Sequence, residues 1–260
     1  MNGAGNDFVL IDNRDGSVSL SREQIAKLCH RQRGVGADGL ILLRNAEGDG
    51  DWAWDFYNAD GSDAEMCGNG ARCFASYIQH TIGGEGELSF ETACGLIRAT
   101  IGDTTVTVNL TDPHSLVLNQ TIAMNNGDQT VHSLNTGVPH AVLFVEDADA
   151  AMVSSLGEEI RFHDHFAPAG TNVNFVQILS PAHIRVRTYE RGVGETLACG
   201  TGVCASAILA ARLNDWPANV QVQVLGGDTL GVAFESDGDE FSNVQLTGPA
   251  QFMFEGTATV

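Results

Sequence analysis

The stretch YNADGSDAEMCGNGARC, Tyr57–Cys73, holds a Tyr, nine further residues and then Cys-Gly-x-Gly. The same order returns 132 residues later in YERGVGETLACGTGVC, Tyr189–Cys204. One chain therefore carries two copies of a thiol-bearing turn, and this repetition is the first indication of its fold.

Two further similarities support an internal duplication. VNLTDP at Val108–Pro113 resembles VQLTGP at Val244–Pro249, and GAGNDFVLI at Gly3–Ile11 resembles GTNVNFVQI at Gly170–Ile178. The spacing between the copies is too long for a solenoid repeat. The sequence therefore predicts two similar domains, residues 1–113 and 114–249, followed by a short tail over residues 250–260.

The composition is that of a globular protein with an excess of acidic residues. The 260 residues are 43% hydrophobic, enough for one large or two smaller cores. A formal net charge of −20 would repel the phosphates of a nucleic acid, and it would also suit a chain solvated at high salt. No apolar run reaches the roughly 18 residues of a membrane span and no leader peptide is evident, so we expect a cytoplasmic protein with no membrane partner.

Local patterns predict an α+β fold in which strands dominate. Segments rich in β-branched and aromatic residues are predicted as strands: 7–12, 39–43, 52–58, 88–92, 96–101, 105–110, 140–146, 174–179, 183–190, 220–225, 231–236 and 243–247. A helix is predicted over residues 21–32 from the spacing of Ile25, Leu28 and Cys29, although Ser21 starts no clean capping box. A further helix is predicted after each Cys-Gly-x-Gly, and both are apolar almost all round, which indicates burial against a sheet.

The two Cys-Gly-x-Gly turns have the features needed to bind a carboxylate beside a reactive thiol. Glycines let the backbone approach a ligand, and a helix start offers unpaired N–H groups and the positive end of the dipole. The same field lowers the pKa of a thiol toward neutrality. Two such turns facing one ligand would invert a stereocentre next to a carboxylate, one thiolate removing the Cα proton and the other thiol returning one to the opposite face. The single lysine, Lys27, gives little scope for pyridoxal phosphate.

The remaining cysteines and a histidine pair are assigned no chemistry. Four cysteines are expected to be core or structural residues: Cys29, Cys73, Cys94 and Cys204. The chain has no Cys-x-x-Cys pair, and a metal site is not expected. His163 and His165, in RFHDHF, are expected in a surface loop.

Together these motifs resemble diaminopimelate epimerase, a family of amino-acid epimerases that work without pyridoxal phosphate. The segments that carry the resemblance are GAGNDF, RGVGADGL, NADGSDAEMCGNGARCFA, GVPH, GTNVNF and YERGVGETLACGTGVCA. The resemblance implies two pseudo-symmetric domains, each a barrel-like, mostly antiparallel sheet around a central helix. It also implies that the tail returns to the first domain as a strand over residues 250–260 and that a cofactor-free active site lies in the cleft between the domains.

By this resemblance the protein is an isomerase that interconverts LL- and meso-diaminopimelate, in the biosynthesis of lysine and peptidoglycan precursors. Cys67 is implied as the proton acceptor and Cys199 as the donor for the LL substrate, with the roles exchanged in reverse. His140 and Glu190 match positions that tune the pKa values of the two thiols. The implied substrate-binding residues are Asn6, Asn58, Gly68, Asn69, Asn172, Glu190, Arg191, Gly200 and Thr201.

Some positions depart from the family pattern and leave the substrate open. Val138 stands where the family often has Asn before Pro-His, and Gly39 stands where some members have Gln, so two polar contacts are lost. The resemblance also implies a homodimer, with Phe254 where the family often has an interface Tyr. The expected partners are a small-molecule substrate and a second copy of the chain.

Two alternatives remain at this level. The fold also resembles that of proline racemase, hydroxyproline epimerase and phenazine-pathway isomerases, so the substrate could be another amino acid, of the proline, hydroxyproline or histidine type. Glu190 and Arg191 favour a substrate with a second polar end. A protein of another class, a thiol redox switch or binding module in which Cys67 and Cys199 form a disulfide, would use the same residues.

Overall fold

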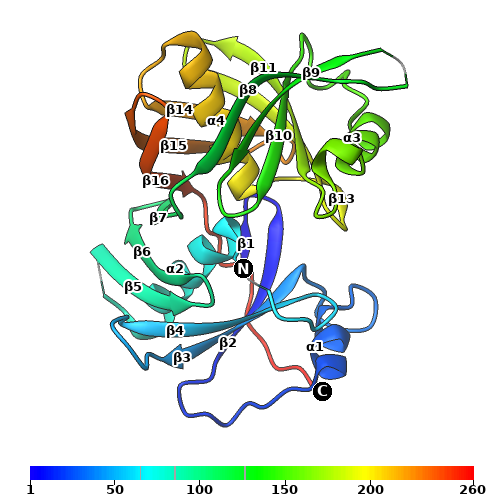
Figure 1. Cartoon of the computed structure of the whole chain (residues 1–260). Coiled ribbons are helices and arrows are strands. Elements are labelled where there is room, and N and C mark those ends of the chain that lie inside the picture. Colours follow the sequence, from blue (N-terminus) through cyan, green and yellow to red (C-terminus); the bar gives the residue numbers. More distant parts are fainter. Residues whose placement is uncertain (65, 85, 126) are drawn as a thin grey trace. The chain divides into compact units, whose positions relative to one another are not determined.

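The computed structural model describes residues 1–64, 66–84, 86–125 and 127–260, which form two compact units (Figure 1). The first unit comprises Met1–Asn109 together with Gly248–Val260, and the second comprises Leu110–Thr247. The tail belongs to the first unit, where the backbones of Asn2 and Gln251 exchange two hydrogen bonds of 2.8 Å. The prediction of a strand over residues 250–260 was wrong, because this pair is an isolated bridge and the tail continues without a regular strand. The assignment of residues 1–113 and 114–249 to two epimerase domains stays a prediction.

The first unit is built on strands in the order β1-β2-β3-β4-β5-β6-β7. Their bounds are β1 (Asn2–Gly3), β2 (Asn6–Asp12), β3 (Gly39–Asn45), β4 (Trp52–Asn58), β5 (Gly86–Thr92), β6 (Gly95–Ile101) and β7 (Val106–Asn109). β2 pairs with β3 and β4 with β5 in parallel, and the other pairs are antiparallel. A parallel pair needs a crossover, and the two crossovers hold the helices α1 (Arg22–Cys29) and α2 (Gly68–Ile82).

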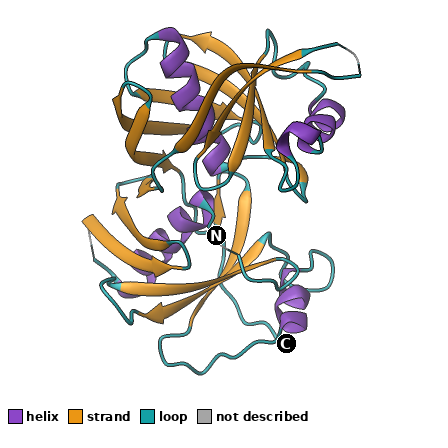
Figure 2. Cartoon of the chain, viewed as in Figure 1, coloured by secondary structure: helices purple, strands orange, loops and turns teal. Residues whose placement is uncertain are grey.

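Helix α2 forms the centre of the first unit. It contacts β1, β2 and β3 as well as β6 and β7, so strands from both ends of the sheet surround it (Figure 2). Phe74 on α2 packs edge to face on Phe90, with ring centroids 4.8 Å apart, and on Trp54, with centroids 5.5 Å apart. Every residue of the first half of α2, from Gly68 to Ala75, is buried, which confirms the prediction of a helix enclosed on almost all sides.

Helix α1 begins with a capping box, contrary to the expectation from the sequence. The Oγ of Ser21 accepts from the backbone N–H of Gln24 at 3.3 Å, and Gln24 Oε1 accepts from the backbone N–H of Ser21 at 2.8 Å. The expectation was wrong because Gln serves at the third helical position as well as Glu does. Ile25, Leu28 and Cys29 are buried as predicted, and they pack in one cluster with residues of β3.

The second unit is built on strands in the order β16-β15-β14-β12-β11-β10-β9-β8, with β13 paired to β12. Their bounds are β8 (His114–Ile122), β9 (Gln129–Asn135), β10 (Pro139–Phe144), β11 (Asn172–Ser180), β12 (His183–Glu190), β13 (Gly194–Thr196), β14 (Asn219–Val224), β15 (Thr229–Asp237) and β16 (Glu240–Gly248). Its helices are α3 (Val153–Arg161), the 3-10 turn η1 (Asp164–Phe166) and α4 (Gly200–Asn214). Helix α4 contacts β9, β10, β11, β12, β14 and β15, and eleven of its 15 residues are buried.

The two units repeat one pattern of strand pairing, which supports the duplication. In the second unit β10 pairs with β11 and β12 with β14 in parallel, and the crossovers hold α3 and α4. By chain order, β4 therefore corresponds to β12, α2 to α4 and β7 to β16. β2 corresponds to β10, whereas the sequence comparison had matched GAGNDFVLI in β2 with GTNVNFVQI in β11. That match was wrong, because β2 is the strand before the crossover helix α1 whereas β11 is the strand after the crossover helix α3, and similar composition does not make two strands equivalent.

Five elements of the second unit were not predicted from the sequence: β8, β9, α3, η1 and β13. β8 is mostly exposed or half-buried and carries polar residues, so it lacks the pattern of a core strand. β9 pairs with it in a hairpin. α3 contains Gly157, and the side chain of its N-cap residue Met152 makes no capping hydrogen bond, so the helix carries no clear start signal.

No helix in the described part of the chain is both long and apolar enough to cross a membrane. α2 and α4 have 15 residues each, fewer than the roughly 20 that a spanning helix needs.

Candidate functional site

The first Cys-Gly-x-Gly turn lies at the start of α2. Cys67 is the N-cap residue, extended at φ −143° and ψ 116°, and half-buried. Its Sγ accepts a hydrogen bond from the backbone N–H of Gly70 at 3.4 Å. Gly68 is the first residue of the helix, so the thiol lies at the positive end of the α2 dipole. This arrangement suits both a thiolate and a bound carboxylate.

A chain of side chains fixes the amides of Asn6 and Asn69 beside this turn. Arg72, which is fully buried, donates to Asn69 Oδ1 at 2.9 Å. Asn69 therefore directs its Nδ2 toward Asn6, whose Oδ1 accepts at 2.6 Å. Asn6 Nδ2 in turn donates to Asp38 Oδ2 at 3.0 Å. The structure thus brings together two of the predicted substrate-binding residues, and a buried cation sets which way their amides point.

Asn58, the last residue of β4, is paired with Gly39, the first residue of β3. Gly39 has Phe8 as its partner on one side and Asn58 on the other. Asn58 is exposed, and its Nδ2 donates to Ser62 Oγ at 3.0 Å. A side chain at Gly39 would meet the carbonyl oxygen of Tyr57 at 2.7 Å. Glycine is therefore the residue that fits this backbone.

The second Cys-Gly-x-Gly turn lies at the start of α4. Cys199 is the N-cap residue, extended at φ −117° and ψ 110°, and only 6% exposed. Its Sγ lies 3.6 Å from Thr201 Oγ1. The backbone N–H of Val203 donates to the Cys199 carbonyl at 2.8 Å and closes the first helical turn. The two turns are alike in backbone, but a backbone N–H donates to the first sulfur whereas a hydroxyl approaches the second.

His140 on β10 reaches the second turn through Thr201. The Nε2 of His140 lies 3.0 Å from Thr201 Oγ1, and its Nδ1 lies 3.1 Å from Asn174 Nδ2. Thr136 Oγ1 donates to the Thr201 carbonyl at 2.9 Å and holds the start of the helix. The structure therefore brings His140, Thr201 and Cys199 into one cluster.

The second unit also brings Asn172, Glu190 and Arg191 together, at the end of β12. The Oδ1 of Asn172 accepts from the backbone N–H of Arg191 at 2.8 Å, so one predicted substrate-binding residue holds another in place. Glu190 Oε1 accepts from Thr196 Oγ1 at 2.6 Å. Arg191 Nη1 donates to the carbonyl of Ala169 at 3.3 Å.

His140 is neutral throughout the physiological range. Its side chain is only 1% exposed, and burial, helped by the positive charge of Arg191, lowers its pKa to about 3. Histidine in an unfolded chain has a pKa of about 6.5. Between the folded and the unfolded pKa, the unfolded chain therefore binds a proton on this histidine, whereas the folded protein does not. The stability that follows from this difference is complete above about pH 6.5 and is lost as the pH falls toward 3.

We therefore expect the free energy of unfolding to fall on acidification, with His140 contributing on the order of 5 kcal/mol across the whole window. Urea unfolding at several pH values between 8 and 4.5, for the wild type and His140→Gln, measures this contribution. The variant should decline less steeply than the wild type. His132, whose pKa burial also lowers, adds the same slope to both proteins. Equal slopes would contradict the account.

The four other cysteines divide by exposure. Cys29, Cys73 and Cys204 are buried as expected, but Cys94 is exposed in the turn between β5 and β6, so a core or structural place was wrong for it. Burial raises the pKa of Cys29 to about 11 and that of Cys73 to about 12. The thiols of Cys29 and Cys73 are therefore not ionised at neutral pH and are not nucleophilic.

Histidine and acidic side chains give no indication of a metal centre. Within the described ranges, no group of three or more His, Cys, Asp or Glu side chains is placed to hold a metal ion. His163 and His165 flank the start of η1 instead of lying in an irregular loop, and His163 Nε2 lies 3.0 Å from the carbonyl oxygen of Ala123.

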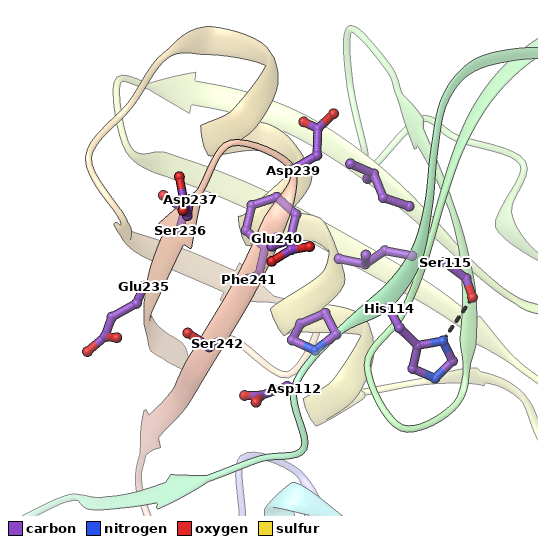
Figure 3. Close-up of a pocket in the computed structure, with 13 residues that line it drawn as sticks. Asp112, His114, Ser115, Glu235, Ser236, Asp237, Asp239, Glu240, Phe241 and Ser242 are labelled. Atoms are coloured by element: carbon purple, nitrogen blue, oxygen red, sulfur yellow. Dashed lines mark hydrogen bonds between the residues drawn. The ribbon is translucent and has the colours of Figure 1, made fainter.

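A cavity of about 580 Å³ in the second unit does not coincide with the predicted site (Figure 3). It is lined by residues 112–116, Leu134 and residues 235–237 and 239–242. Its carboxylates are Asp112, Glu235, Asp237, Asp239 and Glu240. So acidic a surface repels an anionic ligand, and none of the predicted site residues reaches it.

Two residues beside the turns were missed in the sequence. Arg72 has the appearance of an ordinary helical residue, yet it is fully buried and also donates to the carbonyls of Gly68 and Pro249, at 3.4 and 3.3 Å. Its burial follows from the return of the tail, which local pattern does not reveal. Asn174 is likewise fully buried. A polar residue that opens the predicted apolar strand NFVQIL was the signal that could have found it.

The chain is similar to known proteins both in sequence and in fold. The sequence model of the family described as diaminopimelate epimerase matches residues 1–116 and 132–253. A diaminopimelate epimerase of Hydrogenobaculum sp. (strain Y04AAS1) is 44% identical over 268 residues, which cover 98% of this chain and 95% of that protein. The diaminopimelate epimerase of Chlorobaculum tepidum is 40% identical over 267 residues, all of both chains.

Solved structures share the fold at much lower identity. A phenazine biosynthesis protein of Bacillus anthracis superposes with a TM-score of 0.72 at 13% identity, covering 96% of this chain and 92% of that one. A probable proline racemase of Agrobacterium radiobacter K84 superposes with a TM-score of 0.67 at 21% identity, covering 89% and 81%. The predicted α+β fold of the epimerase type is confirmed.

Proposed function

The chain belongs to the diaminopimelate epimerase family, a family of isomerases, and we propose that it interconverts LL- and meso-diaminopimelate. One structural observation supports this proposal above the others. Cys67 and Cys199 each cap the N-terminus of a largely buried 15-residue helix, followed in both cases by Gly-x-Gly. The chain thereby holds two thiols in chemically similar surroundings, as a reversible inversion requires.

In the proposed reaction the helix starts bind the α-carboxylate of the substrate. The backbone at Gly68–Asn69 and Gly200–Thr201 supplies N–H groups, and both dipoles present their positive ends. Negative charge that develops as the Cα proton leaves spreads onto this carboxylate, so the same groups stabilise the transition state.

The two sulfurs divide the proton transfer. The thiolate of Cys67 takes the Cα proton from the LL substrate, and the thiol of Cys199 gives a proton to the opposite face. The product leaves the enzyme with the protonation states of the two sulfurs exchanged, ready for the reverse reaction. The two thiols therefore titrate as one coupled pair.

Glu190 and Arg191 would bind the second amino-acid group of the substrate, the one remote from the reacting Cα. A guanidinium binds a carboxylate through two parallel hydrogen bonds, and a carboxylate pairs with an ammonium group. Asn6, Asn58 and Asn172 supply further amide hydrogen bonds. A monofunctional amino acid lacks this second end and would make no contact with the Glu190 and Arg191 side chains.

The proposal includes the setting of the reaction. Sulfur on each face supplies both the acid and the base, so the chemistry requires no cofactor or metal ion. We propose that residues 1–113 and 114–249 act as the two epimerase domains of a cytoplasmic homodimer. Its reaction would serve the biosynthesis of lysine and of peptidoglycan precursors.

A panel of substrates in D₂O tests the function. The reduced protein is incubated with LL-diaminopimelate, L-proline, trans-4-hydroxy-L-proline and L-histidine, and NMR follows the Cα protons. We expect exchange and inversion with diaminopimelate alone. Exchange with proline or histidine but not with diaminopimelate would refute the substrate. Exchange with none, together with a Cys67–Cys199 disulfide in protein prepared without reductant, would favour a redox role.

A further inference from the structure

A line of hydrogen bonds crosses the second unit and ends at a sulfur. Thr188 Oγ1 donates to Asn174 Oδ1 at 2.9 Å, and Asn174 Nδ2 lies 3.1 Å from His140 Nδ1. His140 Nε2 lies 3.0 Å from Thr201 Oγ1, which lies 3.6 Å from the Sγ of Cys199. Asn174, Thr188 and His140 are each at most 3% exposed, so these are buried interactions in which an unmatched donor or acceptor is costly.

The direction of each bond in this line follows from one backbone carbonyl. Asn174 Nδ2 also lies 3.2 Å from the carbonyl oxygen of Ala141, which can only accept. The atom at this position is therefore the amide nitrogen, which donates and cannot accept. His140 Nδ1 must then be the acceptor, so the proton of the neutral ring lies on Nε2.

The remaining two bonds follow from the first. With its proton on Nε2, His140 donates to Thr201 Oγ1. The hydroxyl oxygen of Thr201 accepts this hydrogen bond, and the hydroxyl hydrogen is directed to the nearby sulfur of Cys199. A hydroxyl that donates to a thiolate stabilises the charged form of the cysteine.

We propose that Asn174 is a positioning residue: it fixes His140 in the Nε2–H tautomer and so makes Thr201 a hydrogen-bond donor to the sulfur of Cys199. The proposal deepens the proposed function, because it states how the second thiol is held ready, and its tests need no substrate. It also explains the difference between the two turns. In the first, the N–H of Gly70 donates to Cys67, and in the second a side-chain hydroxyl fills that role.

The glycine that follows Thr201 supports this assignment. A Cβ at Gly202 would fall on Asn174 Oδ1 and would lie 3.2 Å from His140 Cε1. Helix α4 therefore approaches the amide and the ring so closely that only glycine fits. The motif Tyr189–Cys204 also carries the charged residues Glu190 and Arg191. The positive charge of Arg191 opposes protonation of His140 and so helps to keep the ring neutral.

The tautomer can be observed directly. Protein labelled with ¹⁵N-histidine gives a long-range ¹H–¹⁵N correlation pattern for each ring, and loss of one pattern in His140→Gln assigns the signal. We expect His140 to show a protonated Nε2 and an unprotonated Nδ1 between pH 6 and 8. In Asn174→Asp the carboxylate accepts from Nδ1, and the pattern should show a proton on Nδ1. A wild-type ring with its proton on Nδ1 alone would overturn the proposal.

The consequence for the sulfur is measured by the pH dependence of alkylation. Iodoacetamide labelling of Cys199, followed at the peptide level by mass spectrometry, should shift to higher pH in Asn174→Asp, with a rate at pH 7 about tenfold lower. Because Asn174→Asp also adds a charge, Thr201→Val provides the neutral test. It should shift the labelling of Cys199 by a similar amount while the His140 tautomer stays as in the wild type.

Two variants separate positioning from a loss of structure. Thr201→Ser keeps the hydroxyl and should restore the wild-type alkylation profile. Thr188→Val disturbs the same buried cluster but leaves Asn174 Nδ2 between Ala141 and His140, so tautomer and profile should both persist. If Thr201→Val is labelled at Cys199 with the wild-type pH profile, the hydroxyl does not serve the sulfur and the proposal fails. Each of these results stands whether or not diaminopimelate is the substrate.

Discussion

Replacing either Cys67 or Cys199 with Ser is expected to lower epimerisation at least about 10³-fold, because a serine hydroxyl is a far weaker base than a thiolate. The loss in kcat/KM should be the same for the LL and the meso substrate. An enzyme cannot alter the equilibrium constant, so a change in one chemical group must affect both directions equally. Initial rates measured from each side, with circular dichroism to confirm the fold, provide the test.

Cys94→Ser is the matched control for these variants. Cys94 is exposed and takes no part in either turn, so its replacement should leave the rate unchanged and should exclude a general effect of losing a thiol. If Cys199→Ser retained the wild-type rate, the two-sulfur account would be wrong. The redox or binding alternative would then be preferred.

Gly202→Ala is expected to reduce both stability and activity. The added methyl group would fall on Asn174 Oδ1, in a helix that is buried from Gly202 to Ala211, and neither the strand nor the helix can move away easily. Overpacking of this kind costs about 1–3 kcal/mol in the free energy of unfolding. Turnover should fall as well, because the displaced amide no longer sets the His140 ring. Urea unfolding and the epimerisation rate together measure the two effects.

The equivalent glycine of the first turn offers a close control. A Cβ at Gly70 would have Cys67 Cβ, Ile41 Cδ1 and Phe8 Cε1 as neighbours, each at an ordinary contact distance of 3.5 Å. Gly70→Ala should therefore be neutral or should stabilise the protein by up to about 1 kcal/mol, as alanine does in a helix. Equal destabilisation by the two substitutions would show that the contact with Asn174 is not the cause.

The turns could be predicted from the sequence because their physical basis is local. A Cys, a Gly-x-Gly and an apolar helix follow one another directly, and the structure starts α2 and α4 one residue after Cys67 and Cys199. The same holds for most of the strands, whose β-branched composition marks them. Local pattern was insufficient where strands were compared between units, since β2 and β11 share composition but not position in the fold.

The residues that support the turns could not be predicted because their partners are distant in sequence. Asn174 meets His140 because β10 and β11 pair in parallel across a crossover that contains α3. Arg72 is buried because the tail brings the carbonyl of Pro249 to it. The residues that flank Asn174 and Arg72 do not identify either partner. The direction of the hydrogen bonds at His140 depends further on the single carbonyl of Ala141.

The position of the deuterium label after a brief reaction in D₂O tests the central claim most directly. If two sulfurs act on opposite faces, the proton leaves with one and a deuteron arrives from the other. Meso-diaminopimelate formed from the LL substrate at low conversion should then carry one deuterium at the inverted Cα, while the recovered LL substrate carries none. Product that retains the original proton, or substrate labelled as fast as product, would show that a single base serves both faces and would contradict the account.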